Sequence, residues 1–166
     1  MIDRDGAAPV EPIGGRDLAS LVALNNAHAT ELSWLDPECM ATLVRRSFQA
    51  RVVGGDAGFL LAFDQDADYG SPNFRWFKGR HERFVYVDRV VVDPAARGRG
   101  LARALYEDLF AATAAASHTL VTCEVNLVPA SPASDAFHAR LGFAEVGQTE
   151  LAGSGKRVRY LARPLP

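Results

Sequence analysis

The sequence predicts a mixed α+β domain, because strand, helix and hairpin patterns follow one another along a chain of 166 residues. An apolar strand at 84–92 leads through a glycine-rich turn into an amphipathic helix at 101–116. A second apolar strand at 120–125 completes a βαβ unit. Glycine turns within 50–63 and 144–162 separate further strand patterns and indicate antiparallel hairpins. Together these observations favour one mixed sheet with helices packed on it.

Composition limits the classes of protein that fit. The chain is 48% hydrophobic and 23% charged, which suits one domain over residues 1–166. A net charge of −2 gives no basic surface for nucleic acid, so no nucleic-acid partner is expected. There is no apolar run of ~20 residues and no signal-like start at 1–6, so we expect no membrane partner and a cytoplasmic location. Cys39 and Cys123 lack metal-ligand spacing and are interpreted as buried thiols, with no metal.

The N-terminal half contains two helices and a hairpin. After a polar leader, Asp17 caps a helix whose inner positions include Leu21 and Asn25. A polar loop leads to a second helix that begins at Asp36-Pro37. Strands at 50–53 and 58–63 form the hairpin.

The remaining elements frame the βαβ unit. The connection 64–83 is long and aromatic, and we interpret it as a partly helical flap. A short helix at 132–141 has Ser131 at its N-cap and ends at Gly142 in the left-handed conformation. Strands at 144–151 and 158–162 form the final hairpin.

The turn between the strand and the helix of the βαβ unit has the character of a phosphate cradle. Gly98 and Gly100 let the backbone approach a ligand, and the next helix directs its free amides and positive dipole end at an anion. No Lys-Ser or Lys-Thr follows, which excludes the ATP-type loop. Arg103 stands where the dinucleotide fingerprint needs a small residue.

Two motifs resemble those of a known family. Arg97, Gly100 and Ala102 fit an Arg/Gln-x-x-Gly-x-Gly/Ala pattern, and the segment 137–143 resembles a Phe-Tyr-x-Lys-x-Gly-Phe signature. Both are found, in this order, in the GNAT (GCN5-related) N-acetyltransferases, and the stretch 73–89 resembles an uncharacterised bacterial branch of them. The resemblance implies a twisted, mostly antiparallel sheet of about six to seven strands, splayed into a V between its two middle strands and flanked by about four helices.

The resemblance also implies the chemistry. Such a protein moves an acetyl group from acetyl-CoA directly to a primary amine of a small molecule or peptide, within a ternary complex. The alternative is a coenzyme A binding or sensing module with little turnover. A homodimer is possible. The residues expected to bind the cofactor are Val90, Val91, Val92, Arg97, Gly98, Arg99, Gly100, Leu101, Ala102, Asn126, Ser131 and Arg140.

Three residues are candidates for proton transfer. His138 stands where the family has a tyrosine that protonates the leaving thiolate, so it is either the replacement acid or a structural residue of the pocket. Asp88 interrupts an apolar strand and is either the base or the partner of Arg89. Glu124 on the next strand is the other candidate base, acting through water.

The acceptor amine is expected near the loop 25–34 and the aromatic flap. For the rings of the flap, packing in the core is an equally good interpretation. For Ser131, capping the helix is preferred to binding the cofactor. The candidate acceptor residues are Asn26, His28, Trp34, Tyr69, Asn73, Phe74 and Tyr86.

Overall fold

The structure, a computed structural model, describes residues 6–166, so the expectation for the first residues of the chain falls largely outside it. The strands are β1 (Val10–Pro12), β2 (Gln49–Val53), β3 (Gly58–Asp64), β4 (Val85–Val92), β5 (Leu120–Val128), β6 (Ala144–Leu151) and β7 (Lys156–Pro164). The helices are α1 (Ala19–Ala27), α2 (Ala29–Leu32), α3 (Pro37–Arg46), α4 (Pro72–Lys78), α5 (Leu101–Ala115) and α6 (Pro132–Arg140), with a 3-10 turn at Pro94–Ala96.

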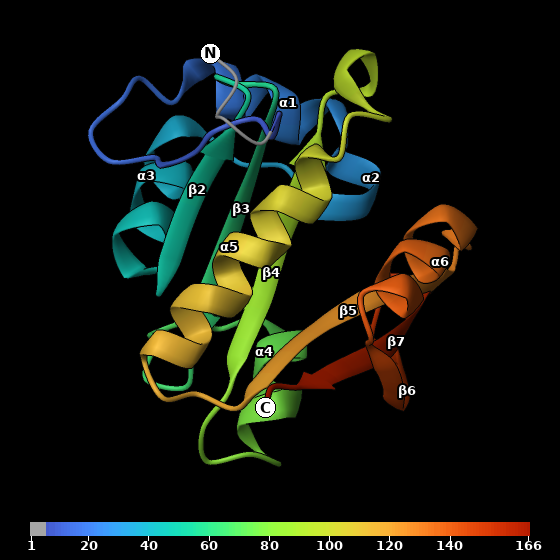
Figure 1. Cartoon of the computed structure of the whole chain (residues 1–166). Helices are drawn as coiled ribbons and strands as arrows, with labels where there is room; N and C mark the ends of the chain where they lie inside the picture. The colour runs from blue at the N-terminus through green and yellow to red at the C-terminus, as the bar shows by residue number, and fades with distance from the viewer. Residues whose placement is uncertain (1–5) are drawn as a thin grey trace.

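One seven-stranded sheet has the order β1-β2-β3-β4-β5-β7-β6 (Figure 1). Every neighbouring pair is antiparallel except β4 and β5, which are parallel. Among the described residues, β4 and β5 pair only at Val85 with Val121 and at Tyr86 with Thr122. Beyond these two pairs the strands separate, which confirms the predicted V at the middle of the sheet.

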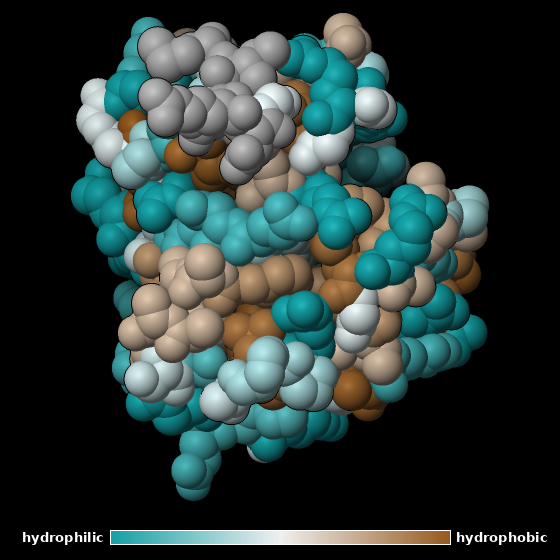
Figure 2. All heavy atoms as spheres, in the orientation of Figure 1, coloured by the Kyte–Doolittle hydropathy of each residue, from teal (hydrophilic) through white to brown (hydrophobic). Residues whose placement is uncertain are grey.

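The two faces of the sheet are covered by different helices. Helix α5 packs on one face, where Leu105 and Leu109 meet Leu60 and Val121 in one core cluster. Helices α1 and α3 pack on the other face, around Leu61. Alternation along β3 places Leu60 and Leu61 on opposite faces. Figure 1 shows α5 across the near face, and Figure 2 shows hydrophobic residues reaching the surface between α5 and α6.

A β-bulge interrupts the pairing of β3 with β4. Leu61 pairs with Arg89 and Ala62 pairs with Val87, so Asp88 is an extra residue with no partner on β3. A bulge resets the alternation of a strand. The side chains of Asp88 and Arg89 consequently meet on the same face, although they are neighbours in the sequence.

Several expected boundaries change in the structure. Residues interpreted as a polar leader form the edge strand β1, and the loop expected between the first two helices contains α2. The flap is helical at α4, so the described residues contain six helices where about four were expected. The N-cap of α1 is Leu18, without a side-chain cap bond, so the expected cap at Asp17 is wrong; Asp17 accepts the Ala19 amide at 2.9 Å from one position earlier. Gly142 has a φ of 89°, as predicted. Cys123 is buried, but Cys39 is exposed, so its interpretation as a buried thiol is wrong. No helix of the described residues is long and apolar enough to cross a bilayer.

Candidate active site

A cleft of about 230 Å³ opens where β4 and β5 separate. Its walls come from both strands, from the end of α1 and from α2, and from α6. The lining residues are His28, Glu31, Leu32, Val87, Asp88, Val90, Val91, Val92, Arg97, Tyr106, Cys123, Glu124, Val125, Asn126, Ser131, Ser134 and His138. The cleft therefore brings together the three candidate proton-transfer residues and six of the expected cofactor residues.

The cradle begins at Arg97, its one residue that lines this cleft, whereas Arg99 and Leu101 line a separate pocket. Gly98 and Gly100 have φ values of 77° and 73°, and a Cβ at either position meets no atom within 4 Å. The first amides of α5 have no acceptor within the helix, and the positive end of its dipole is directed the same way. Arg97 and Arg99 are exposed beside this end. An open, positive backbone loop of this kind fits a pyrophosphate.

The inner edge of β4 also fits coenzyme A. Past Tyr86, the backbone groups of β4 that face β5 have no partner strand among the described residues. Val90, Val91 and Val92 all line the cleft along this edge. Amide groups of a ligand can pair with such an edge as an added strand does.

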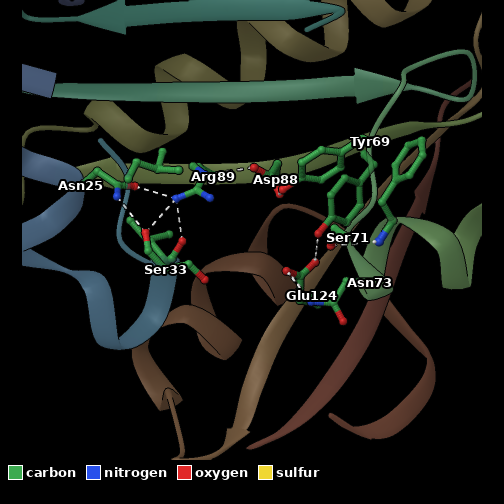
Figure 3. Close-up of polar contacts among 12 residues, drawn as sticks. Asn25, Ser33, Tyr69, Ser71, Asn73, Asp88, Arg89 and Glu124 are labelled. Carbon is green, nitrogen blue, oxygen red and sulfur yellow. Dashed lines mark hydrogen bonds and ion pairs between the residues drawn. The ribbon is translucent and has the colours of Figure 1, made fainter. Parts of the chain in front are cut away.

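Glu124 lies at the centre of a hydrogen-bond network that crosses the V (Figure 3). The Tyr86 hydroxyl donates to Glu124 Oε2 at 2.7 Å, and Asn73 Nδ2 donates to Oε1 at 3.1 Å. The Tyr160 hydroxyl in turn donates to Asn73 Oδ1 at 2.8 Å. Burial raises the pKa of Glu124 to about 8, against the lowering effect of the Tyr86 hydrogen bond. A carboxyl group with this pKa exchanges protons near neutral pH, as a general base must.

Asp88 is engaged by two side chains. Arg89 Nε lies 3.0 Å from Asp88 Oδ2, and the Tyr69 hydroxyl donates to Oδ1 at 2.6 Å. Both side chains of the ion pair are 7% exposed. Burial raises the pKa of Asp88, while the Arg89 charge acts in the opposite direction. This geometry supports the interpretation of Asp88 as the partner of Arg89.

Arg89 also holds the segment that follows α2. Its Nη1 donates to Asn25 Oδ1 at 2.9 Å and to the carbonyls of Leu32 and Ser33 at 2.6 and 3.1 Å (Figure 3). Ser33 has a φ of 67°, which is unfavourable for a residue other than glycine. The buried guanidinium therefore stabilises a strained turn at the rim of the cleft.

His138 is 4% exposed, and both of its ring nitrogens have hydrogen-bond partners. Nδ1 lies 2.8 Å from the Ser134 carbonyl, and Nε2 lies 2.7 Å from the Tyr106 hydroxyl. Burial lowers the pKa of the imidazole. The ring contributes to the wall of the cleft, with its polar atoms turned to α5 and to its own helix.

The remaining cofactor residues are placed unequally. Asn126 and Ser131 line the cleft, whereas Arg140 is exposed on α6. Ser131 occupies the N-cap position of α6, but its side chain bonds no helix amide. The preferred interpretation of this hydroxyl as a cap is therefore wrong, and the hydroxyl is available to the cleft.

The expected acceptor residues do not form one surface. Tyr69, Asn73 and Tyr86 bond the two carboxylates, whereas Phe74 is 1% exposed in an aromatic core cluster. Asn26 is used within the fold, because its amide bonds both backbone groups of Leu35.

The other two expected acceptor residues lie apart from that network. His28 lies near the cradle, with Nε2 3.5 Å from Arg97. Trp34 is 67% exposed and lies outside the residues that line the cleft.

Sequence reasoning missed Tyr106, Tyr160 and the structural role of Arg89. Tyr106 follows Leu105 on the buried side of α5, so its helical position indicated burial and gave no sign of a partner. Tyr160 lies on the last strand, 87 positions from Asn73, which it bonds. Among the described residues, no group of three His, Cys, Asp or Glu side chains is placed to hold a metal ion.

Comparison with known families places this cleft in context. The model of the acetyltransferase (GNAT) domain matches residues 48–145, from the start of the β2–β3 hairpin to the start of β6, which is more than half of the chain. The chain belongs to the GNAT acetyltransferase family. This match confirms the predicted family and the predicted enzyme class, an acetyltransferase.

One curated relative is similar in sequence to part of this chain. The mycothiol acetyltransferase of Mycolicibacterium gilvum (strain PYR-GCK) is 36% identical over 96 residues, which cover 55% of this chain and 29% of that protein. The match therefore spans less than a third of the relative's length.

Solved structures share the fold at low sequence identity. Arabidopsis thaliana NAA60 in complex with acetyl-CoA has a TM-score of 0.73 at 15% identity, covering 95% of this chain and 98% of that one. A chain of the NatC complex bound to Gag peptide and CoA gives 0.75 at 13%, covering 96% and 99%. The ribosomal-protein-S18-alanine N-acetyltransferase of Escherichia coli gives 0.68 at 16%, covering 95% and 94%. These similarities confirm the GNAT fold.

Proposed function

We propose that this protein transfers an acetyl group from acetyl-CoA directly to a primary amine of a small molecule or peptide. The observation that carries the proposal is the cleft between β4 and β5, which is lined by Arg97 of the cradle, by the free edge of β4 and by Glu124. Acetyl-CoA, when bound, supplies an acetyl thioester to this cleft. The relatives that carry an acetyltransferase name, and the CoA-bound structures of the same fold, support the assignment.

Different residues of the cleft have different roles in the proposed reaction. Amides of the cradle and the charges of Arg97 and Arg99 bind the pyrophosphate, while the free edge of β4 orients the pantetheine arm. Glu124 takes the proton of the acceptor amine on Oε1 or Oε2, directly or through water. His138, in the wall of the cleft, is the candidate acid that donates a proton to the departing sulfur. Asp88 stays paired with Arg89, whose hydrogen bonds stabilise the turn at the rim of the cleft.

The first test is release of free thiol from acetyl-CoA, with amines, amino acids and short peptides as acceptors, beside calorimetric titration of coenzyme A. Release that depends on one class of amine is the expected result. Micromolar binding of the cofactor with no release from any acceptor would favour the alternative, a sensing module, for which the missing motif tyrosine at His138 is the specific argument. Failure to bind coenzyme A would refute both.

A matched pair of glycine variants tests the cradle. Gly98 and Gly14 both have positive φ, and an added Cβ meets no atom within 4 Å at either position. Alanine at either site costs roughly 1–2 kcal/mol of backbone strain. Only Gly98→Ala places a methyl group against the proposed pyrophosphate, so it should weaken coenzyme A binding at least tenfold by calorimetry. Gly14→Ala should leave the affinity unchanged, and equal affinities for both variants would contradict the proposed cradle.

Several expectations stay predictions. They are the roles of the site residues, the single domain over residues 1–166, the homodimer, the cytoplasmic location and the lack of nucleic-acid or membrane partners.

A further inference from the structure

A pocket of about 360 Å³ lies between α3 and the loop that precedes α4. Its lining residues are Leu35, Glu38, Cys39, Thr42, Leu43, Tyr69 and Arg89. Among the described residues, none lines both this pocket and the cleft between β4 and β5. Pockets that bind small molecules have volumes of about 300–1,000 Å³, so this one is large enough. The proposed acetyl transfer assigns no ligand to it.

The wall between the pocket and the cleft consists of three side chains that bond one another (Figure 3). Asp88 lines the cleft, whereas Arg89 and Tyr69 line the pocket. Arg89 Nε lies 3.0 Å from Asp88 Oδ2, and the Tyr69 hydroxyl donates to Oδ1 at 2.6 Å. The two sites are therefore neighbours, but these side chains keep them apart.

One nitrogen of Arg89 is left for a ligand. Nε pairs with Asp88, and Nη1 donates to Asn25 and to two carbonyls of the turn after α2. Nη2 has no hydrogen-bond partner among the described residues, although Arg89 is only 6% exposed. Nη2 is not one of the enclosed side-chain atoms that lack a partner, so it reaches open space, and Arg89 lines this pocket. A guanidinium N–H in such a place needs an acceptor, which a ligand oxygen in the pocket can supply.

The other groups of the pocket limit the chemistry of the ligand. Its two leucines and its tyrosine ring offer apolar walls. The charge of Arg89 is already matched by Asp88, and Glu38 brings a second carboxylate to the lining. A carboxylate ligand would meet this negative charge, and a cationic ligand would meet the N–H donors of Arg89. A neutral carbonyl group on an apolar body fits both the walls and the free N–H.

We propose that this pocket is a second small-molecule site, which binds the carbonyl oxygen of a neutral compound with an apolar body through Nη2 of Arg89. The carbonyl oxygen accepts from Nη2, and the apolar body packs against Leu35, Leu43 and the Tyr69 ring. No bond is made or broken in this site. Its test needs neither coenzyme A nor an acceptor amine.

Benzamide is the probe, because a planar apolar ring carries one neutral carbonyl group. Two-dimensional NMR of the isotope-labelled chain gives both the affinity and the amides that shift. A compound of this size should bind with millimolar affinity, with shifts centred on residues 35–43, Tyr69 and Arg89. Benzamidine has the same shape but has an N–H donor in place of the carbonyl oxygen, so it should bind at least tenfold more weakly. Benzoate should also bind more weakly, because two carboxylates lie beside the site.

Three variants separate this site from binding elsewhere. Cys39→Trp places a large ring in the pocket from an exposed position of α3, and Ala111→Trp places the same ring on an exposed position of α5. Benzamide binding should be lost in Cys39→Trp and unchanged in Ala111→Trp. Arg89→Lys keeps the charge and removes Nη2, so it should abolish the preference for benzamide over benzamidine. If Arg89→Lys does not fold, the two tryptophan variants and the benzamidine comparison still decide.

The outcomes are distinct. Shifts centred elsewhere, equal affinities for benzamide and benzamidine, tighter binding of benzoate, or unchanged binding in Cys39→Trp would each overturn the inference. Saturating coenzyme A should leave the affinity for benzamide unchanged, and mutual exclusion of the two ligands would overturn the assignment of a second site. Competition of benzamide with the acceptor amine in the thiol-release assay would overturn it as well. A chain that binds benzamide as expected but binds no coenzyme A would support this site while the proposed function fails.

Discussion

The hydrogen bond from Tyr86 to Glu124 allows a quantitative test of the proposed base. Burial raises the pKa of Glu124 to about 8, and the Tyr86 hydroxyl at 2.7 Å opposes that rise. The carboxylate is the active form of a base, so activity should increase as the pH rises through about 8. Near pH 7 about one tenth of the enzyme carries the carboxylate.

Tyr86→Phe removes the hydroxyl and keeps the ring. A hydrogen bond to a charged group contributes about 1.5–3 kcal/mol, which corresponds to about 1–2 pH units of upward shift in the pKa of Glu124. Activity at pH 7 should fall about tenfold to hundredfold and recover at high pH. Thiol release measured from pH 6 to pH 10 under kcat/KM conditions, with one amine for both enzymes, cancels the ionisation of the amine itself.

Two controls decide the interpretation. Glu124→Gln should remove the rising limb of the pH profile altogether. Tyr160→Phe removes a hydroxyl that bonds Asn73 and makes no hydrogen bond to Glu124, so it should shift the limb less than Tyr86→Phe. A limb that stays in place in Tyr86→Phe, or a loss of activity that is equal at every pH, would refute Glu124 as the base.

Two further variants test the support of the site. A Cβ at Gly147 would lie 2.6 Å from Trp76 Cζ2, so Gly147→Ala should destabilise the fold by about 1–3 kcal/mol in denaturant unfolding. Most of this cost should vanish in a Trp76→Leu background, and a cost that persists there would contradict the steric explanation. Arg89→Met leaves Asp88 buried and unpaired and should cost about 3–5 kcal/mol. Adding Asp88→Asn should restore part of that loss, whereas strictly additive effects would argue against the ion pair.

Much of the fold was accessible from local patterns. The strands at β3, β4 and β6 and the helix α5 follow from periodicity over a few residues, and the cradle follows from glycines placed between a strand and a helix. The edge strand β1 was missed, because Val10–Pro12 is three residues long and contains a proline. Short segments carry too little periodic signal, and their structure depends on the strand beside them.

The candidate site also combines features set by local sequence with features set by tertiary contacts. The sequence alone determined the cradle, since Gly98 and Gly100 act through the conformation of their own backbone. The tertiary structure decided the partners of the charged groups. A one-residue bulge on β4 places Asp88 beside Arg89, and Glu124 meets a tyrosine 38 positions away. Local conformation is set by neighbours in the chain, whereas the charge and proton state of a buried group depend on contacts that form only when distant segments pack together.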